Sequence, residues 1–436
     1  MPRAIVAMLT AWVLLPAAMS AQTVSTPSPA QPAAKLSLAD LEKLALQNNP
    51  TIAQADSEIE GARGRAKQAG QFPNPTIGYT GSEINRGPVF NGGEHGFFLE
   101  QTIPLGGKLG LSRQIFAREA TQAKALREVQ RGRVLTDVRV QFYGALAAER
   151  RVETRRELAR IAAEAVAVSR QLYNTGAADR PDVLSSEIEA RQMQVAFEAA
   201  ENDRARVWRQ LAALVNDSSL KPQPLDGSLD ATAPELQRDA VTQEILKKSP
   251  ELTAARAGVE RSQAALTRAR REPTPDLFVR GGPSYNRELL EGSGRPVGWE
   301  AALDVGVTVP LFNRNTGGIA ASRADLARAE REVTRLELSL QSRAADVFNE
   351  YLTNLRNAET YRTEIVPRAE ESYRLYLAKY REMAAAYPQV LVAQRTWSQV
   401  SDEYIRFAEI AWTASLRLQG MLLSGGLDAS PKVGDR

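Results

Sequence analysis

The sequence predicts a mainly α-helical chain that also carries a small transmembrane β part. Three observations lead to this fold class. The two halves of the sequence resemble each other, with matching residues about 200 positions apart. Each half contains a very long helical run without proline. Each half also contains segments in which every second residue is apolar, which is typical of a β-strand with one apolar face.

Five landmarks recur in the same order in both halves, at offsets that grow slowly from 200 to 207 residues. They are Asn49-Pro50 and Ser249-Pro250, Pro73-Asn74-Pro75 and Pro273-Thr274-Pro275, Ile103-Pro104-Leu105 and Val309-Pro310-Leu311, Phe142 and Phe348, and Asp182-Val183-Leu184 and Gln389-Val390-Leu391. This order indicates an internal duplication. We therefore expect a signal peptide (1–20), a flexible lead-in (21–35), repeat 1 (36–215), a Pro-rich linker (216–235), repeat 2 (236–427) and a tail (428–436).

The signal peptide is expected from an apolar run near the N-terminus. Ala4 to Ala18 is an apolar run of 15 residues that contains only one hydroxyl residue, Thr10, and Ala18 and Ser20 place small residues at the −3 and −1 positions of a cleavage site. The run is shorter than the roughly 20 residues that a membrane-spanning helix needs, and Pro16 interrupts it. We therefore expect export from the cytoplasm.

The helices follow the same order in each repeat. A helical segment comes first, at about 37–71 and 235–271, and a Pro-x-Pro pair ends it. A much longer run follows the strands, at about 107–173 and 316–366, before a short break and a last helix. Apolar residues in the second long run have the 3- and 4-residue spacing of a coiled-coil seam: Val333, Leu336, Leu340, Ala344, Val347, Tyr351 and Leu355. The sequence predicts long coiled-coil helices, with a bundle of shorter helices as the alternative.

Four segments alternate like β-strands. The clearest runs from Trp299 to Val309, and its length and pattern match one transmembrane strand. The weaker partners contain Ile77 and Tyr79, then Phe97, Leu99 and Ile103, then Leu277 and Val279, with loops at 81–96 and 281–298. Two hairpins cannot close a barrel, and strand edges cannot face lipid unpaired. A membrane sheet would therefore require several copies of the chain; the alternative is a soluble sheet that caps the helices.

Composition argues against an enzyme. The chain has 436 residues, no Cys and one His, so it can form no disulfide, thiol nucleophile, Cys-ligated metal centre or multi-His metal site. His95 lies in a predicted loop, and no nucleophile, base and orienting group can be assembled around it. Lys plus Arg number 55 against 52 for Asp plus Glu, a balance that indicates no nucleic-acid partner. We expect no catalytic residue, no cofactor and no metal site.

These features together resemble the outer-membrane efflux (TolC-like) family over about residues 36–427. The residues that carry the resemblance are Pro73-Asn74-Pro75, Glu100-Gln101-Thr102-Ile103-Pro104-Leu105-Gly106-Gly107-Lys108, Tyr173-Asn174-Thr175-Gly176, Asp182-Val183-Leu184, Val309-Pro310-Leu311-Phe312 and Ala393-Gln394-Arg395. The Pro-Leu-Gly-Gly-Lys stretch is most similar to the heavy-metal efflux branch, of the cobalt–zinc–cadmium or copper–silver type.

The resemblance implies a homotrimer. Three copies would combine four strands each into a 12-stranded barrel in outer-membrane lipid, and their helices would form a hollow cylinder across the periplasm. The chain would be a passive duct in a tripartite system with a periplasmic membrane-fusion adaptor and an inner-membrane pump of the RND type. The adaptor would dock at the periplasmic helix tips, which contain Tyr173, Gly176, Asp179, Asp182, Val183, Tyr380, Gln389 and Val390.

Two points of the resemblance stay open. The second tip lacks the glycine of the first, with Met383 in its place, and Gln389 stands where many relatives place an Asp. The resemblance therefore does not identify the gate. In the strongest strand, Glu300 and Asp304 either face the lumen and favour cations or belong to an ordinary solvated face. The alternative functions are a drug-efflux or type I secretion channel, and a periplasmic structural coiled-coil protein.

Overall fold

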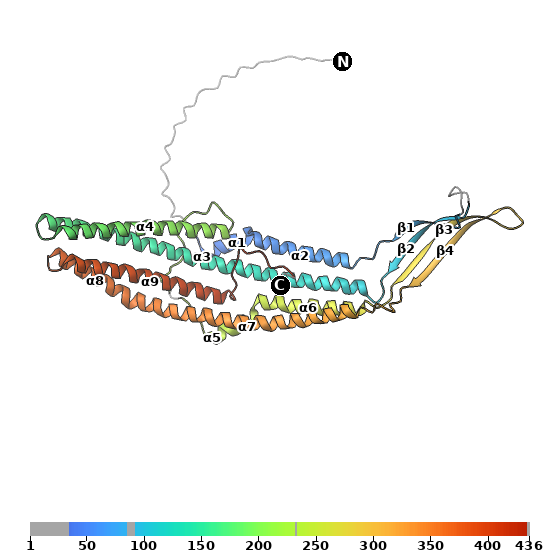
Figure 1. Ribbon diagram of the computed structural model, residues 1–436. Helices are drawn as coiled ribbons and strands as arrows, with labels where there is room; N and C mark the ends of the chain where they lie inside the picture. Colours follow the sequence, from blue (N-terminus) through green and yellow to red (C-terminus); the bar gives the residue numbers. More distant parts are fainter. Residues whose placement is uncertain (1–34, 85–91, 232, 434–436) are drawn as a thin grey trace, which may run out of the picture.

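The computed structural model describes residues 35–84, 92–231 and 233–433. The predicted signal peptide and almost all of the lead-in lie outside these residues. Helices occupy most of an elongated molecule, and a small sheet lies at one end (Figure 1). None of the helices in the described residues is long and apolar enough to cross a membrane.

Both halves of the chain contain the same order of elements. The first half comprises α1 (Leu38–Asn48), α2 (Pro50–Ala69), β1 (Thr76–Ser82), β2 (Glu94–Ile103), α3 (Lys108–Asn174) and α4 (Arg180–Leu214). The second half comprises α5 (Arg238–Lys248), α6 (Pro250–Arg271), β3 (Leu277–Leu289), β4 (Pro296–Val307), α7 (Thr316–Thr360), a π-helical segment (Tyr361–Ile365), α8 (Val366–Arg381) and α9 (Tyr387–Gln419). The fold is therefore mainly helical with one small sheet, as expected.

The first helical segment of each repeat is two helices, so the expectation of one continuous helix was wrong. Pro50 and Pro250 start α2 and α6, because proline lacks the N–H that a continuous helix would need there. Asn49 accepts a hydrogen bond from the backbone N–H of Thr51 (3.0 Å), and its Nδ2 donates to the carbonyl oxygen of Leu214 (3.0 Å). The break is thereby fixed against the end of α4.

The long helices are present. α3 runs unbroken for 67 residues. In the second half the helical run predicted for 316–366 does not stop at Pro367. α7 leads directly into the π-helical segment and α8, which ends at Arg381. There the N–H of Val366 bonds to the carbonyl oxygen of Tyr361, five residues back, and the wider turn accommodates the proline. The predicted seam is confirmed, since Leu336, Leu340 and Tyr351 are buried in one core cluster.

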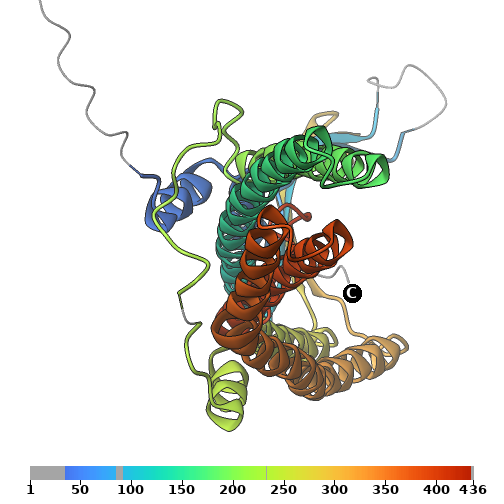
Figure 2. The same cartoon turned by 90° about the vertical axis from the view of Figure 1, so that its left-hand side faces the viewer.

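The helices form a curved wall, with α1 and α5 on its convex side (Figure 2). In the part of the wall that lies next to the sheet, α2 contacts α3, α3 contacts α6, and α6 contacts α7. In the far half the neighbours are α4, α3, α9 and α8. The wall is thus four helices wide in both halves.

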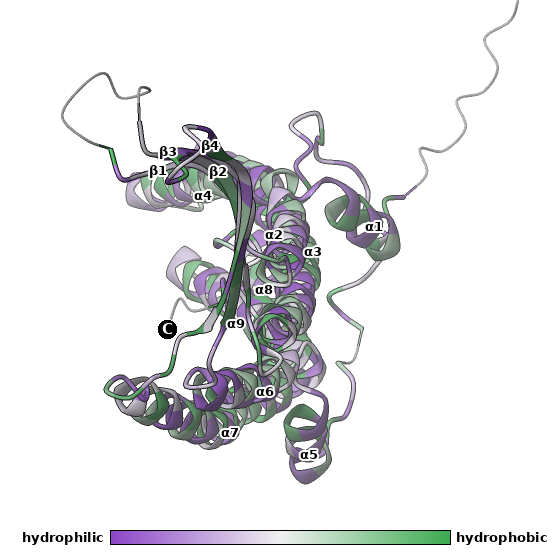
Figure 3. Cartoon of the chain, turned by 90° about the vertical axis from the view of Figure 1, so that its right-hand side faces the viewer, coloured by the Kyte–Doolittle hydropathy of each residue, from purple (hydrophilic) through white to green (hydrophobic). Residues whose placement is uncertain are grey.

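The sheet is antiparallel, has the order β1-β2-β3-β4, and is curved (Figure 3). Its hairpins reach further than the sequence predicted, because β3 continues to Leu289 and β4 begins at Pro296. Gly281-Gly282-Pro283 looked like a loop but lies inside β3. A side chain at Gly282 would collide with the carbonyl oxygen of Phe97, so the close approach of β2 requires a glycine there.

Candidate functional site

The first tip, between α3 and α4, is a Schellman turn. Gly176 has a φ of +76°, in the left-handed region. The N–H of Ala177 donates to the carbonyl oxygen of Leu172 (2.8 Å), and the N–H of Gly176 donates to that of Tyr173 (3.0 Å). These bonds satisfy the last carbonyl groups of α3.

The second tip, between α8 and α9, has the same turn without a glycine. The N–H of Ala384 donates to the carbonyl oxygen of Lys379 (2.8 Å), and that of Met383 donates to Tyr380 (3.1 Å). Met383 has a φ of +60° and occupies the left-handed position of Gly176. A residue that has a side chain loses roughly 1–2 kcal/mol of stability when its backbone adopts the left-handed conformation. The missing glycine therefore changes the energy of the turn and not its shape.

The two tips differ in burial. Tyr173 is 43% exposed, whereas Tyr380 at the matching position is 3% exposed. Val390 is also fully buried. Only Tyr380 and Val390 of the predicted tip residues lie in the packed core. The others are exposed or half-buried: Tyr173, Gly176, Asp179, Asp182, Val183 and Gln389.

Aromatic residues of α8 join it to α3 and to α9 at the second tip. The hydroxyl of Tyr380 donates to Ser169 Oγ (3.1 Å). The ring of Tyr373 stacks on Trp397 at 5.6 Å between centroids. Burial raises the pKa of Tyr373 to about 12, so this phenol stays neutral throughout the physiological range.

An ion pair between an exposed arginine and a buried carboxylate joins α9 to α4. The Glu189 side chain is 1% exposed, and both Nε and Nη2 of Arg395 donate to its Oε2, at 3.0 and 2.8 Å. In the sequence, Arg395 contributes only to the family resemblance, and no local pattern marks Glu189. The partners are 206 residues apart, so the only available signal was that each lies near the same position of its repeat.

Further along the wall, two arginines of α3 bind acidic residues of α9. Arg155 donates to Ser398 Oγ (3.0 Å) and forms an ion pair with Asp402. Arg151 forms an ion pair with Glu409 at 3.3 Å. Burial raises the pKa values of Asp402 and Glu409, and the nearby arginines lower them by less. The α3–α9 interface therefore holds charges that are only partly compensated.

One face of the sheet is polar and carries Glu300 and Asp304. Glu100, Arg280 and Asp304 lie side by side across three strands, because their Cα atoms are ladder partners. The Arg280 guanidinium also lies over the ring of Phe98, 3.8 Å from the centroid. Sequence reasoning missed Arg280, because Gly281 to Pro283 hid the alternation of β3.

The opposite face of the sheet is apolar and exposed. Ile77, Phe97, Trp299 and Leu303 are each exposed by more than 60%. His95 also lies on this face, inside β2 rather than in the predicted loop. Its Nε2 is 2.8 Å from the carbonyl oxygen of Gly92, and its ring stacks on Tyr79. Packing and hydrogen bonding thus account for the only histidine.

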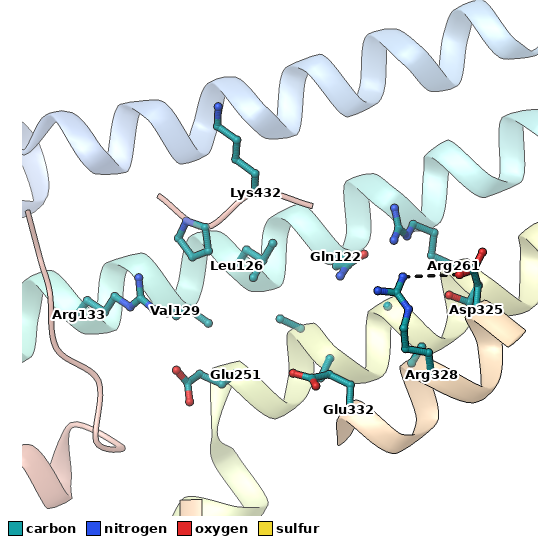
Figure 4. Close-up of a pocket in the computed structure, with 16 residues that line it drawn as sticks. Gln122, Leu126, Val129, Arg133, Glu251, Arg261, Asp325, Arg328, Glu332 and Lys432 are labelled. Carbon is teal, nitrogen blue, oxygen red and sulfur yellow. Dashed lines mark ion pairs between the residues drawn. The ribbon is translucent and has the colours of Figure 1, made fainter. Parts of the chain in front are cut away.

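A pocket of about 420 Å³ lies between α3, α6 and α7, beside Lys432 of the segment after α9 (Figure 4). Arg133 lies toward one end, and Arg261 and Arg328 lie toward the other, where Arg328 pairs with Asp325 (3.6 Å). The charges do not converge on one point. In the described parts of the chain, no group of three or more His, Cys, Asp or Glu residues is placed to hold a metal ion.

Solved structures with a similar fold span almost the whole chain. CusC, reported in a study of folding and transmembrane channel formation, superposes with a TM-score of 0.75 at 15% identity, covering 89% of this chain and 92% of that one. The outer membrane protein VceC of Vibrio cholerae superposes with a TM-score of 0.73 at 19% identity, covering 89% of this chain and 96% of that one. At these identities the likeness establishes the fold.

Two curated relatives are resistance proteins. The cobalt-zinc-cadmium resistance protein CzcC of Cupriavidus metallidurans is 25% identical over 379 residues, which is 86% of this chain and 87% of that protein. The nickel-cobalt-cadmium resistance protein NccC of Alcaligenes xylosoxydans xylosoxydans is 25% identical over 306 residues, which is 68% of this chain and 66% of that protein. The model of the outer membrane efflux protein family matches residues 41–217 and 241–422. The two matched segments contain both hairpins, both tips and the wall between them, and the chain belongs to the outer membrane efflux protein family.

Proposed function

We propose that three copies of this chain form an outer-membrane channel that exports heavy-metal cations. The observation that carries the proposal is the open sheet. β1 and β4 are its outer strands, so each has one unpaired edge, and one face is apolar and exposed. Four strands from each of three copies would give 12 strands, pair every edge and turn the apolar face to lipid.

The wall supports the same assembly. Leu184, Ile188 and Val195 form an exposed apolar stripe on α4, one outer helix of the wall. A groove of about 380 Å³ beside α8, at the other outer helix, is lined by Tyr376, Val392 and neighbouring residues. In a closed ring these two surfaces belong to adjacent copies, and packing them together would bury both.

The substrate proposal rests on the named relatives, which are cobalt-zinc-cadmium and nickel-cobalt-cadmium resistance proteins. The polar face of the sheet would line the lumen, with Glu100, Glu300 and Asp304 as acidic groups and Arg280 between two of them. Metal ions would pass these groups without a dedicated site. Energy would come from an RND-type pump in the inner membrane.

The partner proposal concerns the tips. A periplasmic membrane-fusion adaptor would dock on the exposed tip residues, with Tyr173, Gly176 and Asp179 from the first tip and Gln389 from the second. Tyr380 and Val390 would support that surface from the core of the tip and would not contact the adaptor.

Membrane fractionation, detergent extraction and mass determination test the channel. We expect a trimer in the outer-membrane fraction; a soluble periplasmic monomer would leave only a structural coiled-coil role. A deletion strain challenged with zinc, cobalt, cadmium, copper and drugs tests the substrate. Sensitivity to metals alone is the expected result, and sensitivity to drugs alone or a secretion defect would favour the alternative channels.

Ion selectivity in planar bilayers tests the lumen residues. Asp304→Ala leaves Arg280 beside one acid instead of two, so the preference for cations over anions should fall. Arg280→Ala should raise that preference. Glu244→Gln, an exposed acid on α5 away from the sheet, is the matched control and should change nothing. Unchanged selectivity in both sheet variants would remove these residues from the conduction path.

A further inference from the structure

Exposed apolar residues continue beyond the last ladder pair of the sheet. The final pair of β3 and β4 is Leu277 and Val307. After Val307 the chain leaves the strand and turns at Pro310, where the N–H of Leu311 donates to the carbonyl oxygen of Val309 (3.0 Å). Val309 and Leu311 are 57% and 64% exposed, and the next residue, Phe312, is 99% exposed. Three large apolar residues exposed this close together in the chain are typical of a surface that contacts a nonpolar partner.

Three arginines lie at the two helix ends of the same junction between the sheet and the helices. Arg270 and Arg271 end α6, and Arg314 precedes α7. The two helix ends are in contact, because Asn315 Nδ2 donates to the carbonyl oxygen of Ala269 (2.9 Å). All three arginines are exposed, and none forms an ion pair within residues 35–84, 92–231 and 233–433. Three unpaired cations therefore accompany the exposed Phe312.

We propose that this junction patch, formed by Val309, Leu311, Phe312, Arg270, Arg271 and Arg314, binds anionic phospholipid of the membrane leaflet that faces the helices. The apolar residues would enter the acyl region, and the guanidinium groups would bind headgroup phosphates, which they match as planar multiple donors. The inference rests on the proposed function, because it requires the sheet to lie in a membrane.

Charge favours lipid over a second copy of the chain as the occupant. In a closed ring, the free edge of β4 would meet the start of β1 of the next copy. The residues that lead into β1, from Phe72 to Ser82, include no acid. Asp276, which lies near the patch, is already bound by Lys108 at 2.9 Å. An anionic headgroup would supply the negative charge that these neighbours lack.

Nitroxide labelling at residue 312 tests the apolar part. The chain has no cysteine, so Phe312→Cys gives a single labelling site in the full-length protein. Leu303→Cys, in the sheet, is the lipid control, and Met383→Cys, at the second tip, is the water control. The protein is reconstituted in vesicles of phosphatidylethanolamine and phosphatidylglycerol. We expect oxygen to increase the relaxation rate of the spin label at residue 312, as it does at residue 303. A water-soluble nickel complex should change that rate little.

The controls separate the two inferences. A label at 312 that responds to the nickel complex as at 383, or one shielded from both reagents by a neighbouring copy, would overturn the patch. If the label at 303 also behaves as in water, the proposed membrane sheet fails as well.

Retained lipid tests the arginines. The variant with Arg270→Gln, Arg271→Gln and Arg314→Gln should keep severalfold less phosphatidylglycerol per protein after detergent washing, measured by mass spectrometry. Three other exposed arginines without ion pairs in the described residues, changed together as Arg191→Gln, Arg323→Gln and Arg331→Gln, form the matched control. Equal losses in both triple variants would show only a general effect of net charge and would overturn the patch.

Discussion

The two helix tips have the same backbone and different surroundings. Both are Schellman turns with one left-handed residue, Gly176 in the first and Met383 in the second. The tyrosine three residues earlier is exposed in the first tip and buried in the second. A duplicated sequence therefore repeats the local turn. Which side chains become core depends on the neighbouring helices, since Tyr380 of α8 reaches Ser169 of α3 while Tyr173, at the end of α3, stays exposed.

The largest expected effect comes from the buried tyrosine. Tyr380→Ala removes a buried ring and the bond to Ser169, and substitutions of this kind cost about 3–5 kcal/mol. Tyr173→Ala at the exposed position is the matched control and should cost below about 0.5 kcal/mol. Hydrogen exchange of the tip amides and denaturant unfolding of the purified protein measure both. Equal costs would mean that the two tips are packed alike in solution.

The next effect concerns the ion pair between α9 and α4. Arg395→Ala leaves the Glu189 carboxylate buried without its partner, which costs about 1–3 kcal/mol, discounted because Arg395 is half-exposed. Arg170→Ala breaks an exposed pair with Glu187 in the first tip and should cost about 0.5 kcal/mol or less. The same unfolding measurement applies. An effect at residue 395 no larger than at 170 would contradict the burial of Glu189.

A smaller effect, of opposite sign, is expected at the turns. Met383→Gly relieves the left-handed strain and should stabilise the second tip by about 1 kcal/mol. Gly176→Met should destabilise the first tip by a similar amount. Local hydrogen exchange gives the sign at each tip. A loss of stability in Met383→Gly would show that the methionine side chain makes contacts that outweigh the strain.

The smallest effect is a pH dependence of the α3–α9 attachment. The pKa of Asp402 is raised above its ordinary value of 3.8 by burial, so the folded chain binds this proton more tightly than the unfolded chain. The stability that protonation provides is present below pH 3.8 and is lost as the pH rises through the raised pKa. Asp402→Asn should flatten this part of the stability profile in denaturant titrations at several pH values. If the variant shows the same slope of unfolding free energy against pH, the raised pKa of Asp402 is contradicted.

Much of the fold could be predicted from local patterns. The absence of proline predicted α3 almost to the residue, and the 3- and 4-residue spacing predicted the buried seam of α7. The predictions were wrong where Gly or Pro lies inside a strand or a helix and not in a loop. Gly282 keeps β2 and β3 close, and Pro367 is tolerated inside a helix because a π-helical turn absorbs it.

The site was less predictable. The two helix breaks lie where the sequence predicted them, but the different burial of the residues around them was not foreseen. Glu189–Arg395, Arg155–Asp402 and the row around Arg280 join residues that are far apart in sequence, and no local spacing marks them. Their docking and lumen roles stay predictions.

The sequence by itself determined the duplication, the order of helices and strands, the positions of the two turns and the apolar and polar faces of β4, because backbone sterics and side-chain periodicity act over a few residues. Tertiary structure alone decided that Tyr380 is core while Tyr173 is surface, and that Arg280 lies between two acids. Burial and ion pairing depend on which helices and strands become neighbours, and those contacts form between residues far apart in the chain.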